Sequence, residues 1–309
     1  MMSPALTAEF VLLAAIWGAS FLFMRAGALE FGPVGTAFLR VLLAGAVLLP
    51  LVLWRGQLGA WRGRIGTLLV VGLLNSGLPF VLYAWGVLHI STGLASILNA
   101  TTPLWGALVA WLWLNDRLDR LRAVGLALGF AGVLLLSWNK AGAVSAALAV
   151  LACLTATLCY GIAGSYTRKY LTGMPPLAAA AGSLCGAALW LAPAALLWMP
   201  PLTGPDAPGW RAWGAVALLA VLCTAVAYVL YFRLIERAGP QRALTVTYLI
   251  PVFGVGYGVA LLGEALTGWM LACGAVIVLG TALATGYLEA NRLRALTGWL
   301  RGGATTPPG

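Results

Sequence analysis

Residues 94–118, LASILNATTPLWGALVAWLWLNDRL, form an apolar segment that is interrupted by a proline and followed by an acidic residue. A second segment, ALTVTYLIPVFGVGYGVALLGEALT at residues 243–267, has the same order of features. A shift of 148 residues places Pro103 on Pro251 and Asp116 on Glu264. Each segment is long enough to cross a hydrocarbon core of roughly 30 Å, which takes about 20 apolar residues. The two halves of the chain therefore contain related membrane spans.

The amino-acid composition indicates that membrane spans make up the whole chain. Of its 309 residues 62% are hydrophobic and 8% are charged, against about 45–50% and about 25% in soluble domains. Apolar runs occur at about 7–28, 33–53, 65–88, 91–113, 121–138, 144–167, 177–198, 212–235, 242–262 and 268–287. We therefore predict an all-α membrane protein with ten transmembrane helices and no soluble domain.

The net charge of +10 comes from 18 Lys and Arg residues that are scattered between the apolar runs. They form no basic stripe, so we expect no nucleic-acid partner and only the lipid bilayer around the protein. With a cytoplasmic N-terminus, 14 basic residues lie inside and three, Arg25, Lys140 and Arg211, lie outside. The positive-inside rule then places both termini in the cytoplasm of an inner (plasma) membrane protein. Arg40, within the second span, is expected to snorkel outward.

An internal repeat relates the two halves. A shift of 143 residues pairs Trp17 with Tyr160, Gly18 with Gly161, Arg25 with Arg168, Pro33 with Pro176 and Pro50 with Pro193. Each half holds five predicted spans, an odd number, so the halves must be inverted relative to each other, as in many secondary transporters. We predict two five-helix repeats, 1–140 and 141–290, and a disordered cytoplasmic tail, 291–309.

Both halves resemble the EamA domain of the drug/metabolite transporter superfamily. The resemblance rests on the two segments quoted above and on AIWGASFLFMRAG (15–27) and FLRVLLAGAVLLP (38–50). It implies a ten-helix carrier with inverted repeats that exports amino acids or other metabolites, with the bacterial aromatic amino-acid exporters as the nearest type. Asn115-Asp116 departs from the usual Gly-Glu of the family. A nucleotide-sugar or drug carrier and a proton-coupled antiporter stay open as alternatives.

The interrupted spans indicate where a substrate binds, because unwound helices line the sites of such carriers. A proline frees the carbonyl four residues before it, here the carbonyls of Asn99 and Thr247. Our hypothesis is that these carbonyls and side chains accept hydrogen bonds from a substrate ammonium group. The alternative is a simple kink in which nearby threonine hydroxyls satisfy the carbonyls.

Spans three and eight each carry a hydroxyl, an aromatic ring and a tyrosine on one helix face, at positions i, i+4 and i+7. Such a face suits a large amphipathic substrate, although Tyr83 and Tyr231 could instead be membrane-interface tyrosines. With mid-span aromatic residues added, the predicted substrate site is Trp17, Asn75, Ser76, Tyr83, Asn99, Trp105, Tyr160, Thr224, Tyr228, Tyr231, Thr247 and Tyr248, with Pro103 and Pro251 as helix breaks.

Ionisable residues at mid-membrane depth are scarce. The one histidine, His89, falls in a predicted outer turn, and Asp116 and Glu264 fall at span ends, where we expect them to terminate helices. We therefore expect no enzyme, no catalytic residues, no metal and no cofactor, and the chain has no charged ring or filter motif of a channel. The prediction is a carrier, monomeric as a working expectation, that exports small organic solutes by alternating access and facilitated diffusion.

Overall fold

In the computed structural model, residues 4–138, 144–239 and 243–286 are described, and their regular secondary structure is entirely helical. The elements are α1 (Pro4–Trp54), η1 (Leu58–Trp61), α2 (Ile65–Gly72), η2 (Leu73–Gly77), α3 (Leu78–Gly86), α4 (Thr92–Asn99), α5 (Thr102–Leu114), α6 (Arg120–Trp138), α7 (Val144–Tyr170), α8 (Pro176–Trp198), α9 (Trp210–Ala220), η3 (Val221–Val226), α10 (Ala227–Ala238), α12 (Val246–Leu262) and α13 (Gly268–Ala284).

The described helices confirm the prediction of an all-α membrane protein. Seven of them, counted with their continuations across short breaks, are long and apolar enough to cross a membrane, and α12 and α13 are shorter apolar helices. The number of ten crossings, the inverted relation of the halves and the orientation remain predictions. The predicted repeat boundary at 140/141 and the tail 291–309 lie outside the described residues.

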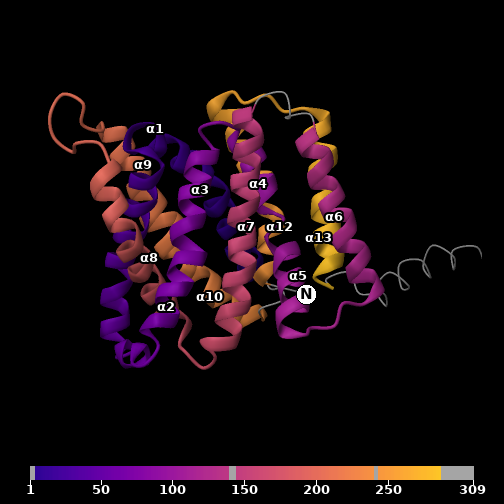
Figure 1. Cartoon of the computed structure of the whole chain (residues 1–309), viewed down its shortest axis with the longest axis horizontal. Helices are drawn as coiled ribbons and strands as arrows, with labels where there is room; N and C mark the ends of the chain where they lie inside the picture. Colours follow the sequence, from indigo (N-terminus) through magenta and orange to yellow (C-terminus); the bar gives the residue numbers. More distant parts are fainter. Residues whose placement is uncertain (1–3, 139–143, 240–242, 287–309) are drawn as a thin grey trace, which may run out of the picture.

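The longest helix, α1, contains the first two predicted spans, with a break at Gly32. Gly32 has φ 70° and ψ 168°, a conformation that glycine adopts without the steric cost of a Cβ atom. Pro33 follows, and proline suits the first turn of a helix because its missing N–H would have no partner there. The chain therefore turns between the two spans, at the upper edge of Figure 1.

The connecting segments gather at two ends of the helix bundle (Figure 1). The lower end in this view holds residues 55–64, 115–119 and 171–175; we call it the arginine-rich end, because Arg55, Arg62, Arg64, Arg117 and Arg168 lie in or beside these segments. The opposite end holds residues 87–91, 199–209 and 263–267.

Two π-helical stretches, η2 and η3, begin at residues 73 and 221, which are 148 positions apart. This is the same shift that relates the second parts of the two halves in the sequence. In η3 the Thr224 hydroxyl donates to the Leu219 carbonyl at 2.9 Å, five residues earlier. A π-helical turn widens a helix locally and often marks a functional site. Here the two stretches carry Asn75, Ser76 and Thr224, all predicted site residues.

Small residues bring helices together beside the centre and at the rim of the bundle. Near the centre, Gly18 of α1 meets Gly254 of α12, and Gly161 of α7 meets the backbone of α5 at Gly106. These two contacts are equivalent under the sequence repeat. At the rim, Gly125 of α6 lies directly against α13, so these two helices run side by side in Figure 1.

Candidate substrate site

A cavity of about 580 Å³ lies between helices of both halves. It is lined by residues of α1, α2, η2, α3, α4, α5, α7, α8, α10 and α12, whereas none of its lining residues belongs to α6 or α13. It reaches the arginine-rich end through Leu171, Met174 and Leu244. The described segments at the opposite end contribute no lining residue. The cavity is therefore directed toward the arginine-rich end.

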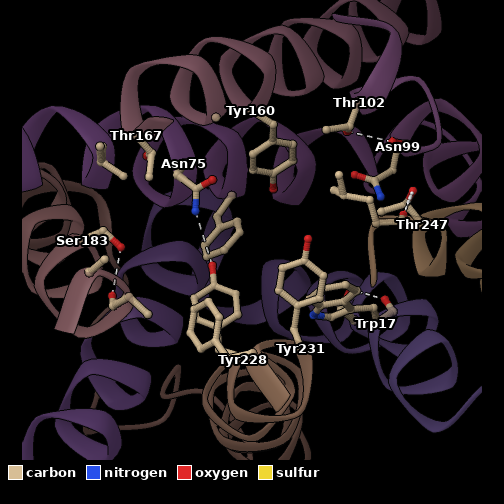
Figure 2. Close-up of a pocket in the computed structure, with 18 of the residues that line it drawn as sticks. Trp17, Asn75, Asn99, Thr102, Tyr160, Thr167, Ser183, Tyr228, Tyr231 and Thr247 are labelled. Carbon is tan, nitrogen blue, oxygen red and sulfur yellow. Dashed lines mark hydrogen bonds between the residues drawn. The ribbon is translucent and has the colours of Figure 1, made fainter. Parts of the chain in front are cut away.

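Eight of the predicted site residues line this cavity: Trp17, Asn75, Tyr83, Asn99, Tyr160, Tyr228, Tyr231 and Thr247. Figure 2 shows the side chains of Tyr160 from α7 and of Tyr228 and Tyr231 from α10 directed into one space. The lining also includes Ser20, whose hydroxyl donates to the Trp17 carbonyl at 2.6 Å within its own helix. Hydropathy and the sequence repeat were therefore enough to predict most of the residues that line this cavity.

The aromatic lining is organised as two pairs, each of which joins the two halves. The rings of Trp17 and Tyr231 have centroids 5.2 Å apart. Those of Tyr83 and Tyr160 are 6.4 Å apart and stacked, with an interplanar angle of 20°. Trp17 is the repeat equivalent of Tyr160, and Tyr83 is the equivalent of Tyr231. One pair is thus the counterpart of the other, on the two sides of the cavity.

Two hydrogen bonds tie the polar groups of the lining together. The Tyr83 hydroxyl donates to Asn99 Oδ1 at 3.2 Å, and the Asn75 amide reaches the Tyr228 hydroxyl at 3.5 Å (Figure 2 shows the latter). The Tyr83 side chain is buried in the bundle, with 2% exposure. The alternative interpretation of Tyr83 as a membrane-interface tyrosine is therefore wrong.

The helix break at Pro103 contains the local hydrogen bond that the kink alternative expected. Helix α4 ends at Asn99 and α5 begins at Thr102, whose hydroxyl donates to the Asn99 carbonyl at 2.8 Å. The freed carbonyl thus already accepts one hydrogen bond, as the kink alternative expected, and Asn99 lines the cavity. In the other half, α12 continues through Pro251, and the Thr247 hydroxyl donates to the Leu244 carbonyl at 2.8 Å.

Four further predicted residues do not line the cavity. Trp105 packs against Phe130 of α6, with ring centroids 4.8 Å apart, because α7 lies directly on the Trp105 backbone. The Tyr248 hydroxyl is 2.7 Å from the Thr285 hydroxyl and so faces the end of α13. Ser76 and Thr224 are fully buried within η2 and η3 and lie behind the lining.

Arg40 is the cavity residue that sequence reasoning placed wrongly. Its side chain does not snorkel outward: it is 6% exposed, and Nε donates to Thr224 Oγ1 at 2.9 Å. The guanidinium carbon lies 3.6 Å from the centroid of the Phe80 ring, a cation–π geometry. Insertion scales put the cost of a charged residue at mid-membrane depth at about 2.5–3.5 kcal/mol, so such residues usually have a function. The Arg40 side chain points inward because the buried Thr224 hydroxyl of η3 accepts its hydrogen bond. A hydropathy pattern does not predict this contact.

At the opposite end, Glu264 closes the space between three helices. Its carboxylate accepts hydrogen bonds from the backbone N–H groups of Thr92 (2.7 Å) and Gly93 (3.1 Å) and from the Thr92 hydroxyl (3.0 Å). Arg25 Nη1 of α1 is 3.8 Å from the same carboxylate. Glu264 follows Gly263, whose φ of 65° ends α12, so it does stand at a helix terminus as expected. It also caps the start of α4.

At the arginine-rich end, the repeat-equivalent Asp116 pairs with Arg168, the counterpart of Arg25, at 2.6 Å and 3.0 Å. Asp116 likewise stands at a helix terminus, after the left-handed Asn115. Hydrogen bonding by Arg168 holds the pKa of the Asp116 carboxyl below its usual range. The side chains are 62% and 37% exposed, so water screens this pair far more than the one at Glu264.

We expect Asp116→Asn to lower the stability at neutral pH by at most about 1 kcal/mol. The lowered pKa means that the pair stabilises the fold above the ordinary aspartate value of about 3.9, and that this stabilisation disappears as the pH falls through the lowered value. Melting temperatures of the wild type and Asp116→Asn, measured from pH 7 downward, should therefore converge in acid. A difference that persists or grows in acid would contradict this assignment.

A bundle of apolar helices around a solute-sized cavity, directed toward one end, defines a membrane transporter. The sequence also identifies the family of transporters. The chain belongs to the EamA-like transporter family, whose sequence pattern matches residues 6–138 and again 147–286, and which is part of the drug/metabolite transporter superfamily. The residues described contain no group of three or more His, Cys, Asp or Glu side chains suited to hold a metal.

Several known proteins are similar over nearly their whole length. The uncharacterized transporter YvbV of Bacillus subtilis is 25% identical, with 92% of each chain covered. The uncharacterized inner membrane transporter YedA of Escherichia coli is 29% identical over 87% of each chain. A probable terminal-alkyne amino-acid exporter of Streptantibioticus cattleyicolor is 25% identical, covering 88% of this chain and 91% of its own. A crystal structure matches 94% of this chain and 100% of its own with a TM-score of 0.65 at 20% identity, which shows a shared fold.

Proposed function

We propose that this protein exports amino acids, including aromatic ones, across the inner membrane by alternating access. The observation that carries the proposal is the cavity, which is built from both halves, lined by aromatic rings and hydroxyls, and directed toward one end only. A carrier of this kind needs a site that is reachable from one side at a time. The inverted pairing of the rings supports a site at the interface of two repeats.

The chemistry of the lining supports a substrate with an apolar ring and a polar end. The two aromatic pairs offer ring faces and edges, and offset or edge-to-face contacts between rings contribute about 0.5–1.5 kcal/mol beyond the burial of area. The Asn75, Asn99 and Thr247 side chains add hydrogen-bonding groups to the lining. A relative named as a probable terminal-alkyne amino-acid exporter supports this substrate class.

The direction of the cavity supports export. If the arginine-rich end is cytoplasmic, as the positive-inside rule predicts, the structure corresponds to the state that loads a solute from the cytoplasm. The contacts of Glu264 with α4 and Arg25 then close the outer end. Transport requires a second state in which these contacts open and the arginine-rich end closes. We propose facilitated diffusion down the substrate gradient, without tight coupling to protons.

The direct test is transport by the purified full chain in liposomes. Uptake of a labelled panel of aromatic, aliphatic and charged amino acids is measured with and without a pH gradient, against protein-free liposomes. We expect saturable uptake of aromatic amino acids that a pH gradient does not change. Absence of uptake for every amino acid would overturn the substrate class, and a strong effect of the gradient would replace facilitated diffusion with proton-coupled exchange.

Truncation of the paired rings should weaken transport selectively. We expect Trp17→Ala and Tyr160→Ala to lower kcat/KM for aromatic amino acids by roughly tenfold, because one lost ring contact and its buried area amount to about 1.5 kcal/mol. Trp111→Ala, which removes a half-exposed indole outside the cavity, is the matched control and should transport like the wild type. Equal activity of Trp17→Ala and the wild type would place the substrate elsewhere.

A further inference from the structure

Arg40 lies in the cavity and has no carboxylate partner among the described residues. Among the described residues that line the cavity it is the one charged side chain. The ion pairs of the described chain all involve other arginines, and no Asp or Glu lies within 4.0 Å of Arg40. Its two recorded contacts, with Thr224 and with the Phe80 ring, are to neutral groups.

The geometry leaves the charged tip of Arg40 available. A guanidinium has five N–H donors in a fixed plane and stays protonated in proteins. One donor, on Nε, is used by Thr224, and the two terminal nitrogens have no hydrogen-bond acceptor in the described part of the chain. The Phe80 ring against the guanidinium holds its orientation. Two parallel N–H groups at such a tip match the two oxygens of a carboxylate.

We infer that Arg40 binds the carboxylate of the transported solute, which supplies the missing counter-ion. The inference rests on the proposed transport function and adds to it the chemical class of one substrate group. A buried arginine gains most from a partner with negative charge, because an uncompensated charge in a low-dielectric site is costly. Tyr160 and Tyr228 line the same cavity as Arg40, so a carboxylate bound there lies near the aromatic lining.

The sequence repeat shows that this charge is confined to one wall of the cavity. The shift of 143 residues that relates Pro33 to Pro176 places Arg40 on Ser183. Ser183 lines the cavity from α8, and its hydroxyl donates to the Ala180 carbonyl at 2.9 Å. The two halves therefore offer matching aromatic rings but different polar ends. This asymmetry fixes the orientation of a bound amino acid, with its carboxylate toward α1.

A purely structural role for Arg40 gives a different expectation. In that case the bond to Thr224 and the contact with Phe80 would serve to hold α1 against η3 and α3, and any loss of Arg40 would lower stability and all transport alike. A role in binding instead changes which solutes are bound. Ligands that share a ring and differ in the carboxylate therefore separate the two roles.

The experiment measures binding to the purified full chain in nanodiscs by titration calorimetry, with uptake into liposomes in parallel. The ligands are phenylalanine, 3-phenylpropionate, which lacks the ammonium group, and phenylalaninamide, in which an amide replaces the carboxylate. We expect the wild type to bind the two carboxylates about tenfold or more tightly than the amide, the effect of hydrogen bonds to a charged group. Arg40→Gln should remove this preference and leave the weak binding of the amide unchanged.

Two further variants separate the loss of the Arg40 charge from a loss of stability and from a general loss of positive charge. Thr224→Val removes the neutral partner of Arg40 but keeps its charge, so it should retain the preference for carboxylates even if it is less stable. Arg211→Gln removes an exposed arginine outside the cavity and should behave as the wild type. Equal affinity of the wild type for phenylalanine and phenylalaninamide, with uptake of both, would overturn the role of Arg40 but not transport. Absence of binding and uptake for every ligand would instead count against the proposed function.

Discussion

Replacing Gly161 by alanine is expected to destabilise the protein by about 1–3 kcal/mol or more, because the added methyl group has no space. An ideal Cβ at position 161 would lie 2.8 Å from the Trp105 carbonyl carbon and 2.9 Å from the Gly106 nitrogen. Both are backbone atoms of α5 and cannot rotate away. Helices α5 and α7 must therefore separate. Because Tyr160 precedes Gly161, its stacking on Tyr83 should be lost as well, so transport should fall together with stability.

The same substitution one turn further along α7 is the control. A Cβ at Gly164 would meet nothing within 4 Å, and glycine is less favourable than alanine in a helix by about 1 kcal/mol. Gly164→Ala should therefore be neutral or stabilising. Thermal unfolding in detergent, followed by tryptophan fluorescence, compares the two variants directly. A melting temperature of Gly161→Ala equal to that of Gly164→Ala would show that α5 and α7 leave room for a methyl group at position 161.

Much of the site could be predicted because it depends on local pattern. Apolar runs of membrane-spanning length can be recognised without any tertiary information. Matches of Pro, Gly and aromatic residues between the two halves, at constant shifts, can be recognised even though most of the sequence is apolar. The pairing of Trp17 with Tyr231 and of Tyr83 with Tyr160 follows from that register once the halves pack together. The sequence therefore predicts which residues share a depth and a helix face.

The errors concern side chains whose direction is decided by a neighbouring helix. Trp105 has the depth of a cavity residue, but the contact of Gly161 with its backbone leaves the indole facing α6. Arg40 turns inward because a buried hydroxyl on η3 offers an acceptor. Neither outcome has a signature in hydropathy or spacing, since each depends on competition between partners in three dimensions.

Glu264 illustrates a role that the sequence suggested only in part. Its position at the end of a span indicates helix termination, yet its carboxylate binds two N–H groups at the start of α4 and faces Arg25 of α1. An anion at a helix N-terminus is stabilised by the unsatisfied N–H groups and by the helix dipole. The side chain is 12% exposed, so these interactions are much less screened than those of Asp116. The contacts therefore join three helices at the closed end of the cavity.

Glu264→Gln should loosen this closure with little change in side-chain size. The neutral amide keeps one acceptor oxygen and turns an NH₂ group toward N–H donors, which leaves at least one of them without a partner. Loss of a hydrogen bond to a charged group costs about 1.5–3 kcal/mol, so amide hydrogens at the start of α4 should exchange with solvent roughly ten- to hundredfold faster. Hydrogen–deuterium exchange of peptides that cover residues 87–96, followed by mass spectrometry, measures this change.

Asp116→Asn is the matched control for the exchange experiment, because it makes the same chemical change at the repeat-equivalent position. It should leave exchange at residues 87–96 as in the wild type, since Asp116 pairs with Arg168 at the other end of the bundle. Faster exchange in Glu264→Gln alone, together with altered transport, would connect this carboxylate to the opening of the closed end. Unchanged exchange around Thr92 in Glu264→Gln would mean that the carboxylate does not hold α4, and that other contacts keep this end shut.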